Sequence, residues 1–158
     1  MKDLFLFLCT LNIVTIGCNY IPCSASSDLS NVKTIQDAAS ISGVYKPDRF
    51  TRQDFKEYSN ADSTMLLLSA DGTITLKNFP KQTFDSWHKL KTDVVNASGT
   101  WTSTYKSGTV TINTNITFDQ ARIIAPEPFR LFKKNDKYYI LIDFGDPDAC
   151  ESVRLEQQ

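Results

Sequence analysis

The residues from Thr109 to Phe118 constrain the fold most strongly, because apolar and polar side chains alternate along them. Val110, Ile112, Ile116 and Phe118 occupy alternate positions, and Thr or Asn stands between them. Successive side chains of a β-strand point to opposite faces of the sheet. The pattern therefore predicts one long strand with one face in the core and the other in solvent.

Further strands are predicted on both sides of this one. The apolar run Thr64–Ser69 and the alternating residues Thr73–Lys77 flank the turn Ala70-Asp71-Gly72, which predicts a hairpin. A second hairpin is predicted around Asn135-Asp136, and other strands are expected at Ile41–Tyr45, Gly99–Tyr105 and Glu151–Glu156. These eight or nine strands predict an all-β fold, an antiparallel meander closed into a barrel. A two-sheet β-sandwich is the alternative.

Two short helices are expected within this all-β chain. One follows Phe50, with Thr51 as its cap and Asp54 three residues on. The other lies in the insert Lys81–Val95, where Phe84, Trp87 and Leu90 recur at three-residue spacing. This insert is either a lid that turns Trp87 and His88 towards a ligand or a helix that plugs one barrel end.

The N-terminal end of the chain has the features of a targeting signal. Leu4 to Ile16 is mostly apolar but shorter than the ~20 residues that span a bilayer. It leads into Val14-Thr15-Ile16-Gly17-Cys18, which resembles a bacterial lipobox. The resemblance implies that residues 1–17 are removed and that Cys18 carries a lipid anchor on a membrane outside the cytoplasm. The alternative is an ordinary secretory signal cut near Ser24-Ala25-Ser26.

The rest of the chain is expected to form a tether and one domain. Residues 18–40, rich in Ser, Asn, Asp and Ala, are expected to be a flexible tether, and residues 41–158 the barrel domain. Asn19 rather than Asp follows Cys18, which favours the outer membrane if the cell is Gram-negative. Cys23 and Cys150 would remain in an oxidising compartment and are predicted to form a disulfide, with two free thiols as the alternative.

Composition and motifs argue against several classes of function. The net charge is −1 and no run of Lys or Arg occurs, which argues against nucleic acid. His88 is the only histidine and has no nucleophile motif beside it, so neither catalysis nor a histidine metal site is expected. The acidic segment Gly145–Glu151 does not match an EF-hand and is interpreted as a turn. We expect no cofactor and no metal.

Several turn and core motifs follow one another in a familiar order: Gly43-Val44-Tyr45, Leu68–Thr73, Asn78-Phe79-Pro80, Ser98–Trp101 and Gly145–Asp148. In this order they resemble small bacterial envelope lipoproteins and secreted proteins with a lipocalin-like barrel. The resemblance spans about Ile41 to Leu155 and concerns the fold. It implies a small β-barrel that can hold an internal cavity, and it carries over no catalytic residues.

Two functions are compatible with these observations. The first is a membrane-anchored, non-catalytic module that binds a small apolar ligand, with Tyr45, Leu67, Trp101, Tyr105 and Trp87 as candidate contacts. The second is a protein-interaction module, such as an immunity or inhibitor lipoprotein against a toxin or hydrolase, acting through the Phe84–Leu90 insert or the Thr/Asn-rich strand face. The predicted inward positions are mostly large, which favours a filled core: Ile74, Leu76, Trp101, Ile112, Phe129, Leu131, Ile140 and Phe144.

Overall fold

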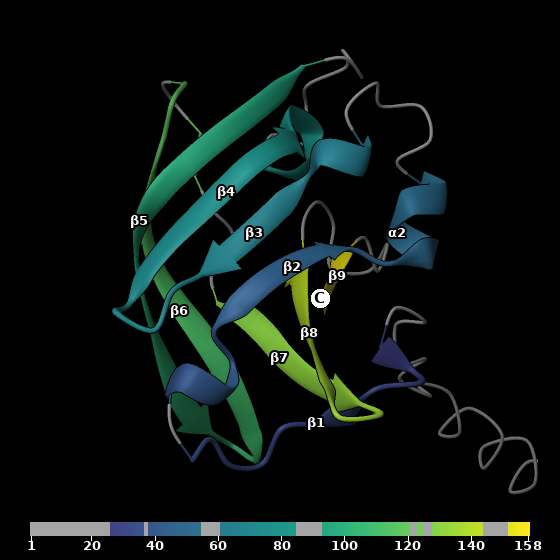
Figure 1. Cartoon of the computed structure of the whole chain (residues 1–158), viewed down its shortest axis with the longest axis vertical. Helices are drawn as coiled ribbons and strands as arrows, with labels where there is room; N and C mark the ends of the chain where they lie inside the picture. The colour runs from purple at the N-terminus through teal and green to yellow at the C-terminus, as the bar shows by residue number, and fades with distance from the viewer. Residues whose placement is uncertain are drawn as a thin grey trace, which may run out of the picture.

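The chain folds into a closed eight-stranded antiparallel β-barrel with one added strand, as a computed structural model shows (Figure 1). The structure describes residues 26–36, 38–54, 61–84, 93–120, 123–124, 128–143 and 152–158. Consecutive strands pair along the meander, and pairing of the first with the last closes the barrel. The barrel strands are β2 (Gly43–Pro47), β3 (Met65–Leu68), β4 (Thr73–Pro80), β5 (Val94–Lys106), β6 (Thr109–Phe118), β7 (Phe129–Lys134), β8 (Lys137–Asp143) and β9 (Ser152–Gln157). The predicted barrel is confirmed, and the sandwich alternative is not formed.

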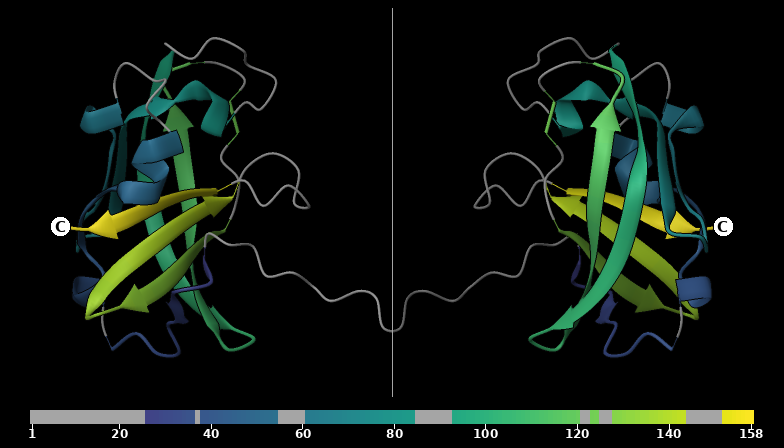
Figure 2. Two further views of the ribbon diagram at one scale, coloured as in Figure 1. Left: turned by 90° about the vertical axis from the view of Figure 1, so that its right-hand side faces the viewer. Right: turned by 90° about the vertical axis from the view of Figure 1, so that its left-hand side faces the viewer.

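Turn chemistry explains where the two longest hairpins reverse. Ser107 and Gly108 join β5 to β6 with φ of 53° and 82°, and Asn135 and Asp136 join β7 to β8 with φ of 48° and 63°. Two successive residues with positive φ give the turn whose twist matches that of the flanking strands. The views in Figure 2 show the β5–β6 hairpin extending past the rest of the barrel at its lower end.

Gly99 allows close contact between the main chains of β5 and β6. A Cβ atom at this position would lie 2.0 Å from the main-chain oxygen of Asn115 on β6. Only glycine allows the two strands to approach this closely. This approach lets β5 and β6 pair from Ala97 and Phe118 to Lys106 and Thr109.

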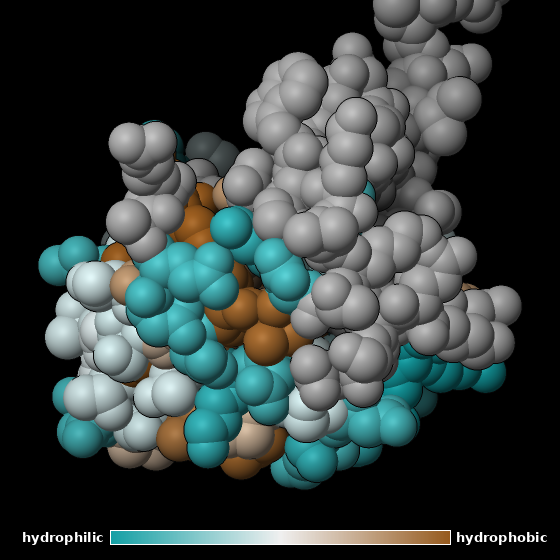
Figure 3. Space-filling view, turned by 90° about the horizontal axis from the view of Figure 1, so that it is seen from above, coloured by the Kyte–Doolittle hydropathy of each residue, from teal (hydrophilic) through white to brown (hydrophobic). Residues whose placement is uncertain are grey.

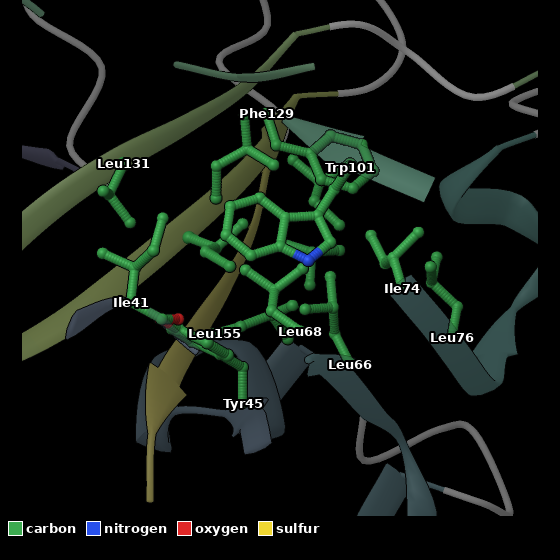
Figure 4. Packing of buried hydrophobic residues seen from close by; sticks show 14 of the residues in the cluster. Ile41, Tyr45, Leu66, Leu68, Ile74, Leu76, Trp101, Phe129, Leu131 and Leu155 are labelled. Carbon is green, nitrogen blue, oxygen red and sulfur yellow. The ribbon is translucent and has the colours of Figure 1, made fainter. Parts of the chain in front are cut away.

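The barrel interior is filled by large apolar side chains (Figure 4). The indole of Trp101 lies in the middle of this cluster, and its Nε1 donates a hydrogen bond of 3.0 Å to the carbonyl oxygen of Ser69. The hydroxyl of Tyr45 donates to the carbonyl oxygen of Ile41 over 2.6 Å. The inward positions that we predicted to be large are buried wherever the structure describes them, namely Ile74, Leu76, Trp101, Ile112, Phe129, Leu131 and Ile140.

The helix α2 (Arg49–Asp54) begins earlier than the sequence suggested. Its cap is Asp48, whose Oδ1 accepts hydrogen bonds from the amides of Phe50 and Thr51, each over 3.0 Å. The prediction that Thr51 caps the helix is therefore wrong. The Thr51 hydroxyl instead bonds the main chain of Arg154 on β9, donating to its oxygen and accepting from its amide. Short 3₁₀ helices form at η2 (Ala38–Ser40), η4 (Ala61–Ser63) and η5 (Lys81–Thr83).

The N-terminal segment, residues 26–36, packs on the barrel. Its strand β1 (Ser30–Asn31) pairs with β7, Val32 is 6% exposed in the core, and the carbonyl of Val32 accepts a hydrogen bond from the amide of Val110. Figure 1 shows the chain between β1 and β2 crossing the lower end of the barrel. The expected flexible tether over residues 18–40 is thus wrong for this segment, since a few apolar residues suffice to hold a polar stretch in place.

An ion-pair cluster on the outer face of β9 holds the same segment. The Arg154 guanidinium lies 2.6 Å from carboxylate oxygens of both Asp28 and Asp48, and Lys134 also pairs with Asp28. Hydrogen bonds from Arg154 and then from Lys134 lower the pKa of Asp28 to about 2. The guanidinium is sandwiched by two rings as well, 5.1 Å from the centroid of Phe50 and 5.2 Å from that of Tyr139.

Several predicted features lie outside the described residues. They are the signal segment 1–17, the lipidated Cys18, the disulfide of Cys23 with Cys150, the ring of Trp87, His88, and the acidic turn 145–151. The described helices are all short, and none has the length and apolar character that crossing a membrane demands.

Candidate functional site

The upper end of the barrel, where β4 ends, β5 begins and β6 ends, is closed by an aromatic contact. Phe84 follows η5, and its ring lies 5.7 Å from the ring of Phe79 on β4 and 4.8 Å from that of Phe118 on β6. Both pairs are tilted, a favourable arrangement for aromatic rings. Phe84 thereby bridges two strands at the barrel mouth through apolar contact alone.

A chain of polar side chains ties the same three strands together at this end. Asn78 interrupts β4 with a φ of 52°, and its amide donates to Oδ1 of Asn96 on β5 over 2.9 Å. Asn96 in turn donates through its own amide and Nδ2 to the carboxylate of Asp119, over 3.1 and 2.8 Å. The positive φ of Asn78 coincides with the register shift between Leu76 and Phe79. These bonds keep the rim rigid while the apolar residues face inward.

Thr83 places an unpaired hydroxyl at the rim. Its side chain is 2% exposed, and its Oγ1 is buried without a hydrogen-bond partner among the residues that the structure describes. A buried hydroxyl without a partner costs about 1–3 kcal/mol. In contrast, the buried Thr64 near the same rim donates its hydroxyl to the carbonyl oxygen of Asn78 over 2.7 Å. The Thr83 hydroxyl can therefore accept or donate a hydrogen bond.

Apolar side chains are exposed beside this rim. Ile123 packs against the core, whereas the side chain of Ile124 is 81% exposed. Figure 3, which views the molecule from above, shows apolar surface between hydrophilic side chains at this end. Among the described residues, the upper end thus combines an aromatic closure, exposed apolar surface and the unpaired buried hydroxyl of Thr83.

Of the four predicted ligand contacts that the structure describes, only two lie together. Tyr45 and Trp101 lie in the barrel core, where burial first, and then the nearby Tyr138 phenol, raise the pKa of Tyr45. Leu67 lies on the outer face, because its neighbours Leu66 and Leu68 occupy the inward positions. Tyr105 has the inward parity of Trp101 but is 61% exposed at the end of the β5–β6 hairpin, beyond the barrel.

The Thr/Asn-rich face of β6 points outward, as its alternation predicted. There the hydroxyls of Thr104 and Thr111 lie 3.0 Å apart across the β5–β6 hairpin, and Asn113 Nδ2 donates to Thr104 Oγ1 over 3.0 Å. These three side chains thus bond one another across the hairpin.

Sequence reasoning missed the rim residues Thr83, Asn78, Asn96 and Asp119. The sequence predicts a helix in the insert after Pro80 with Trp87 as a ligand contact, whereas the structure places Thr83, the third residue after Pro80, at the rim. Nothing in the local sequence reveals that the hydroxyl of Thr83 is buried while that of Thr64 is paired. The Asn96–Asp119 bonds join β5 to the residue that follows β6, and only the strand register brings these two residues together.

The fold and this site define a small closed β-barrel with an apolar, partly polar-lined mouth. Comparison of the chain with known protein families, with curated proteins and with solved structures finds no match. Within the described part of the chain, no cluster of three or more histidine, cysteine or acidic side chains offers a metal site.

Proposed function

We propose that this protein is a lipocalin-like lipoprotein, anchored outside the cytoplasm, that binds a small apolar ligand at the upper end of its barrel. The observation that carries the proposal is the unpaired, buried hydroxyl of Thr83 beside the Phe79–Phe84–Phe118 closure. A structural plug would be expected to bury either an apolar side chain or a hydrogen-bonded one.

The chemistry of the mouth indicates what the ligand is like. Three phenylalanine rings and the two isoleucines offer only apolar contact, so the body of the ligand is apolar. One hydroxyl offers a single hydrogen bond, so the ligand carries one polar group such as a hydroxyl or a carbonyl. Sites for small molecules commonly combine a predominantly apolar lining with a few such polar groups.

The filled lower part of the barrel limits where the ligand lies. Tyr45, Trp101 and Phe129 are buried at 4% exposure or less and occupy the interior. Phe84 is only partly buried and reaches the core from outside the strands. The ligand therefore enters by displacing Phe84, and the interior residues form the floor of its site.

Anchoring through Cys18 completes the proposal. Because the N-terminal segment from Ser26 onward is docked, only eight steps of the chain separate Cys18 from the barrel. Such a linker extends to at most about 28 Å. The barrel is thus held close to the bilayer by its lower end, where β1 lies, with the mouth at the opposite end (Figure 1).

Native mass spectrometry tests the ligand. The variant Cys18→Ser, secreted without a lipid, is purified and compared before and after denaturation, and we expect a small molecule that is lost on denaturation. Binding of the apolar fluorophore Nile red is then measured for Phe84→Ala, which should change its affinity, and for Tyr105→Ala, an exposed aromatic at the other end, which should not. A ligand-free mass together with no Nile red binding would refute the ligand proposal.

Anchoring is tested separately in cells. The full chain should incorporate labelled palmitate and fractionate with membranes, and Cys18→Ser should abolish both. Incorporation that persists in Cys18→Ser, or a soluble wild-type protein, would refute the anchor without bearing on the ligand.

A further inference from the structure

A second concave site lies on the outside of the barrel at its lower end. It is a groove of about 520 Å³ between the N-terminal segment and the β7–β8 hairpin. This volume falls in the range of about 300–1,000 Å³ found for small-molecule sites. The lining is formed by Ser30, Asn31, Val32, Lys33, Thr34, Gln36, Ser40, Lys133 and Tyr138.

The lining is polar and carries only positive charge. It offers hydroxyls, amides and two ammonium groups, and none of its described residues is acidic. The whole chain has a net charge of −1. The two lysines and the lack of a carboxylate in the lining therefore do not simply reflect a general excess of basic residues. Hydroxyl and amide groups both donate and accept hydrogen bonds, which suits a ligand rich in hydroxyls.

The two lysines are available to an anion. Among the described residues, Lys33 makes no ion pair, and its side chain is exposed. Lys133 pairs over 3.1 Å with Asp136, whose side chain is 98% exposed. Exposed pairs of this kind contribute at most about 1 kcal/mol, so a ligand carboxylate or phosphate can replace Asp136.

The walls of the groove are held in place before any ligand arrives. On one side, β1 pairs with Lys133 and Phe132 of β7, and Val32 is anchored in the core. On the other side, Tyr138 packs against the core, with the Lys133 ammonium 5.7 Å from its ring centroid. A preorganised site loses less entropy on binding than a flexible one.

We propose that this groove binds a small polyhydroxylated anion, with the chemistry of a sugar that carries a carboxylate or a phosphate. The hydroxyls and amides of the lining bond the sugar hydroxyls, and Lys33 and Lys133 bind the anionic group. This site is separate from the barrel mouth, and the proposal does not rest on the apolar ligand.

Isothermal titration calorimetry of the secreted Cys18→Ser protein tests the proposal. Glucuronate and glucose phosphate are the acidic probes, and glucose and acetate are controls that each lack half of the required chemistry. We expect saturable binding of at least one acidic probe and binding weaker by about tenfold or more for both controls, since hydrogen bonds to charged groups contribute about 1.5–3 kcal/mol. Which acidic probe binds more tightly distinguishes a carboxylate from a phosphate ligand.

Charge-neutralising variants locate the binding. Lys33→Gln and Lys133→Gln should each weaken it by about tenfold, whereas Lys77→Gln, an exposed lysine of β4, should leave it unchanged. All three positions lie on the surface, so circular dichroism should show an unchanged fold. Absence of binding by both acidic probes, or equal effects of Lys33→Gln and Lys77→Gln, would overturn the proposal. Nile red binding at the mouth should be the same in all three variants.

Discussion

Replacement of Thr83 by valine tests the reasoning about the barrel mouth most directly. Valine has the shape of threonine and the same branching at Cβ, so the side chain keeps its rotamer while the hydroxyl is lost. Because Oγ1 of Thr83 is buried without a partner, the substitution removes a cost of about 1–3 kcal/mol and breaks no hydrogen bond. We expect Thr83→Val to raise the free energy of unfolding by about 1–2 kcal/mol.

The substitution Thr64→Val is a matched control for the direction of the stability change expected in Thr83→Val. Thr64 is 0% exposed, and its hydroxyl donates to the carbonyl of Asn78 over 2.7 Å. The change Thr64→Val therefore strands a buried acceptor and should lower the free energy of unfolding by about 1–3 kcal/mol. Both variants can be compared with the wild type by urea denaturation, with Trp fluorescence and circular dichroism as probes. For a chain of this size, the expected gain in Thr83→Val corresponds to a melting temperature higher by about 2–8 °C.

The affinity of Thr83→Val for the ligand should change in the direction opposite to its stability. If the ligand bonds the Thr83 hydroxyl, Thr83→Val binds it more weakly although the protein is more stable. A loss of stability in Thr83→Val comparable to that in Thr64→Val would show that the hydroxyl is paired in the free protein. That result would refute the argument that Thr83 is reserved for a ligand.

Three further outcomes follow from the fold. Gly99→Ala should destabilise the barrel by about 3 kcal/mol in urea denaturation, since the added Cβ meets the Asn115 oxygen at 2.0 Å. A neutral result would contradict the close contact between β5 and β6 at this position. The pKa of Asp28 is lowered to about 2, so the stability that its ion pairs contribute is present above the unfolded value of 3.8 and is lost as pH falls towards 2. Melting temperatures of Asp28→Asn should therefore depend less on pH in this window than those of the wild type. Burial raises the pKa of Tyr45, so alkaline titration followed by tyrosinate absorbance should show this phenol ionising only as the protein unfolds, and ionisation of every tyrosine in the folded state would exclude its burial.

The barrel could be predicted from the sequence because its strands carry their own signals. Alternation in Thr109–Phe118 and the turns at Gly72, Gly108 and Asn135 set both the strands and their neighbours in the sheet. The ends of the observed strands differ from the predicted ends by a few residues, because pairing with a neighbour extends a strand past its apolar pattern. The start of β5 at Val94 is an example: the predicted strand began at Gly99.

Features that depend on contacts between distant residues could not be predicted. The tether was expected to be free because Ser30 and Asn31 look like linker residues, yet β7 offers them an edge and Arg154 offers Asp28 an ion pair. The burial of Thr83 likewise depends on what packs around it. Hydrogen bonds and ion pairs across more than a hundred residues leave no local pattern in the sequence.

The two ends of the barrel differ in the kind of contact that closes them, and this difference bears on the route that the proposed ligand would take. At the lower end, the hydroxyl of Tyr45 bonds Ile41, and the docked N-terminal segment is held by Val32 and by hydrogen-bonded strand pairing. Opening that end would break several hydrogen bonds at once and detach the N-terminal segment. At the upper end, Phe84 is held by ring contacts worth about 0.5–1.5 kcal/mol beyond their burial, and the apolar ligand that we propose would replace these contacts when it displaces Phe84. Under the proposed function, the ligand would therefore exchange through the upper end rather than the lower one.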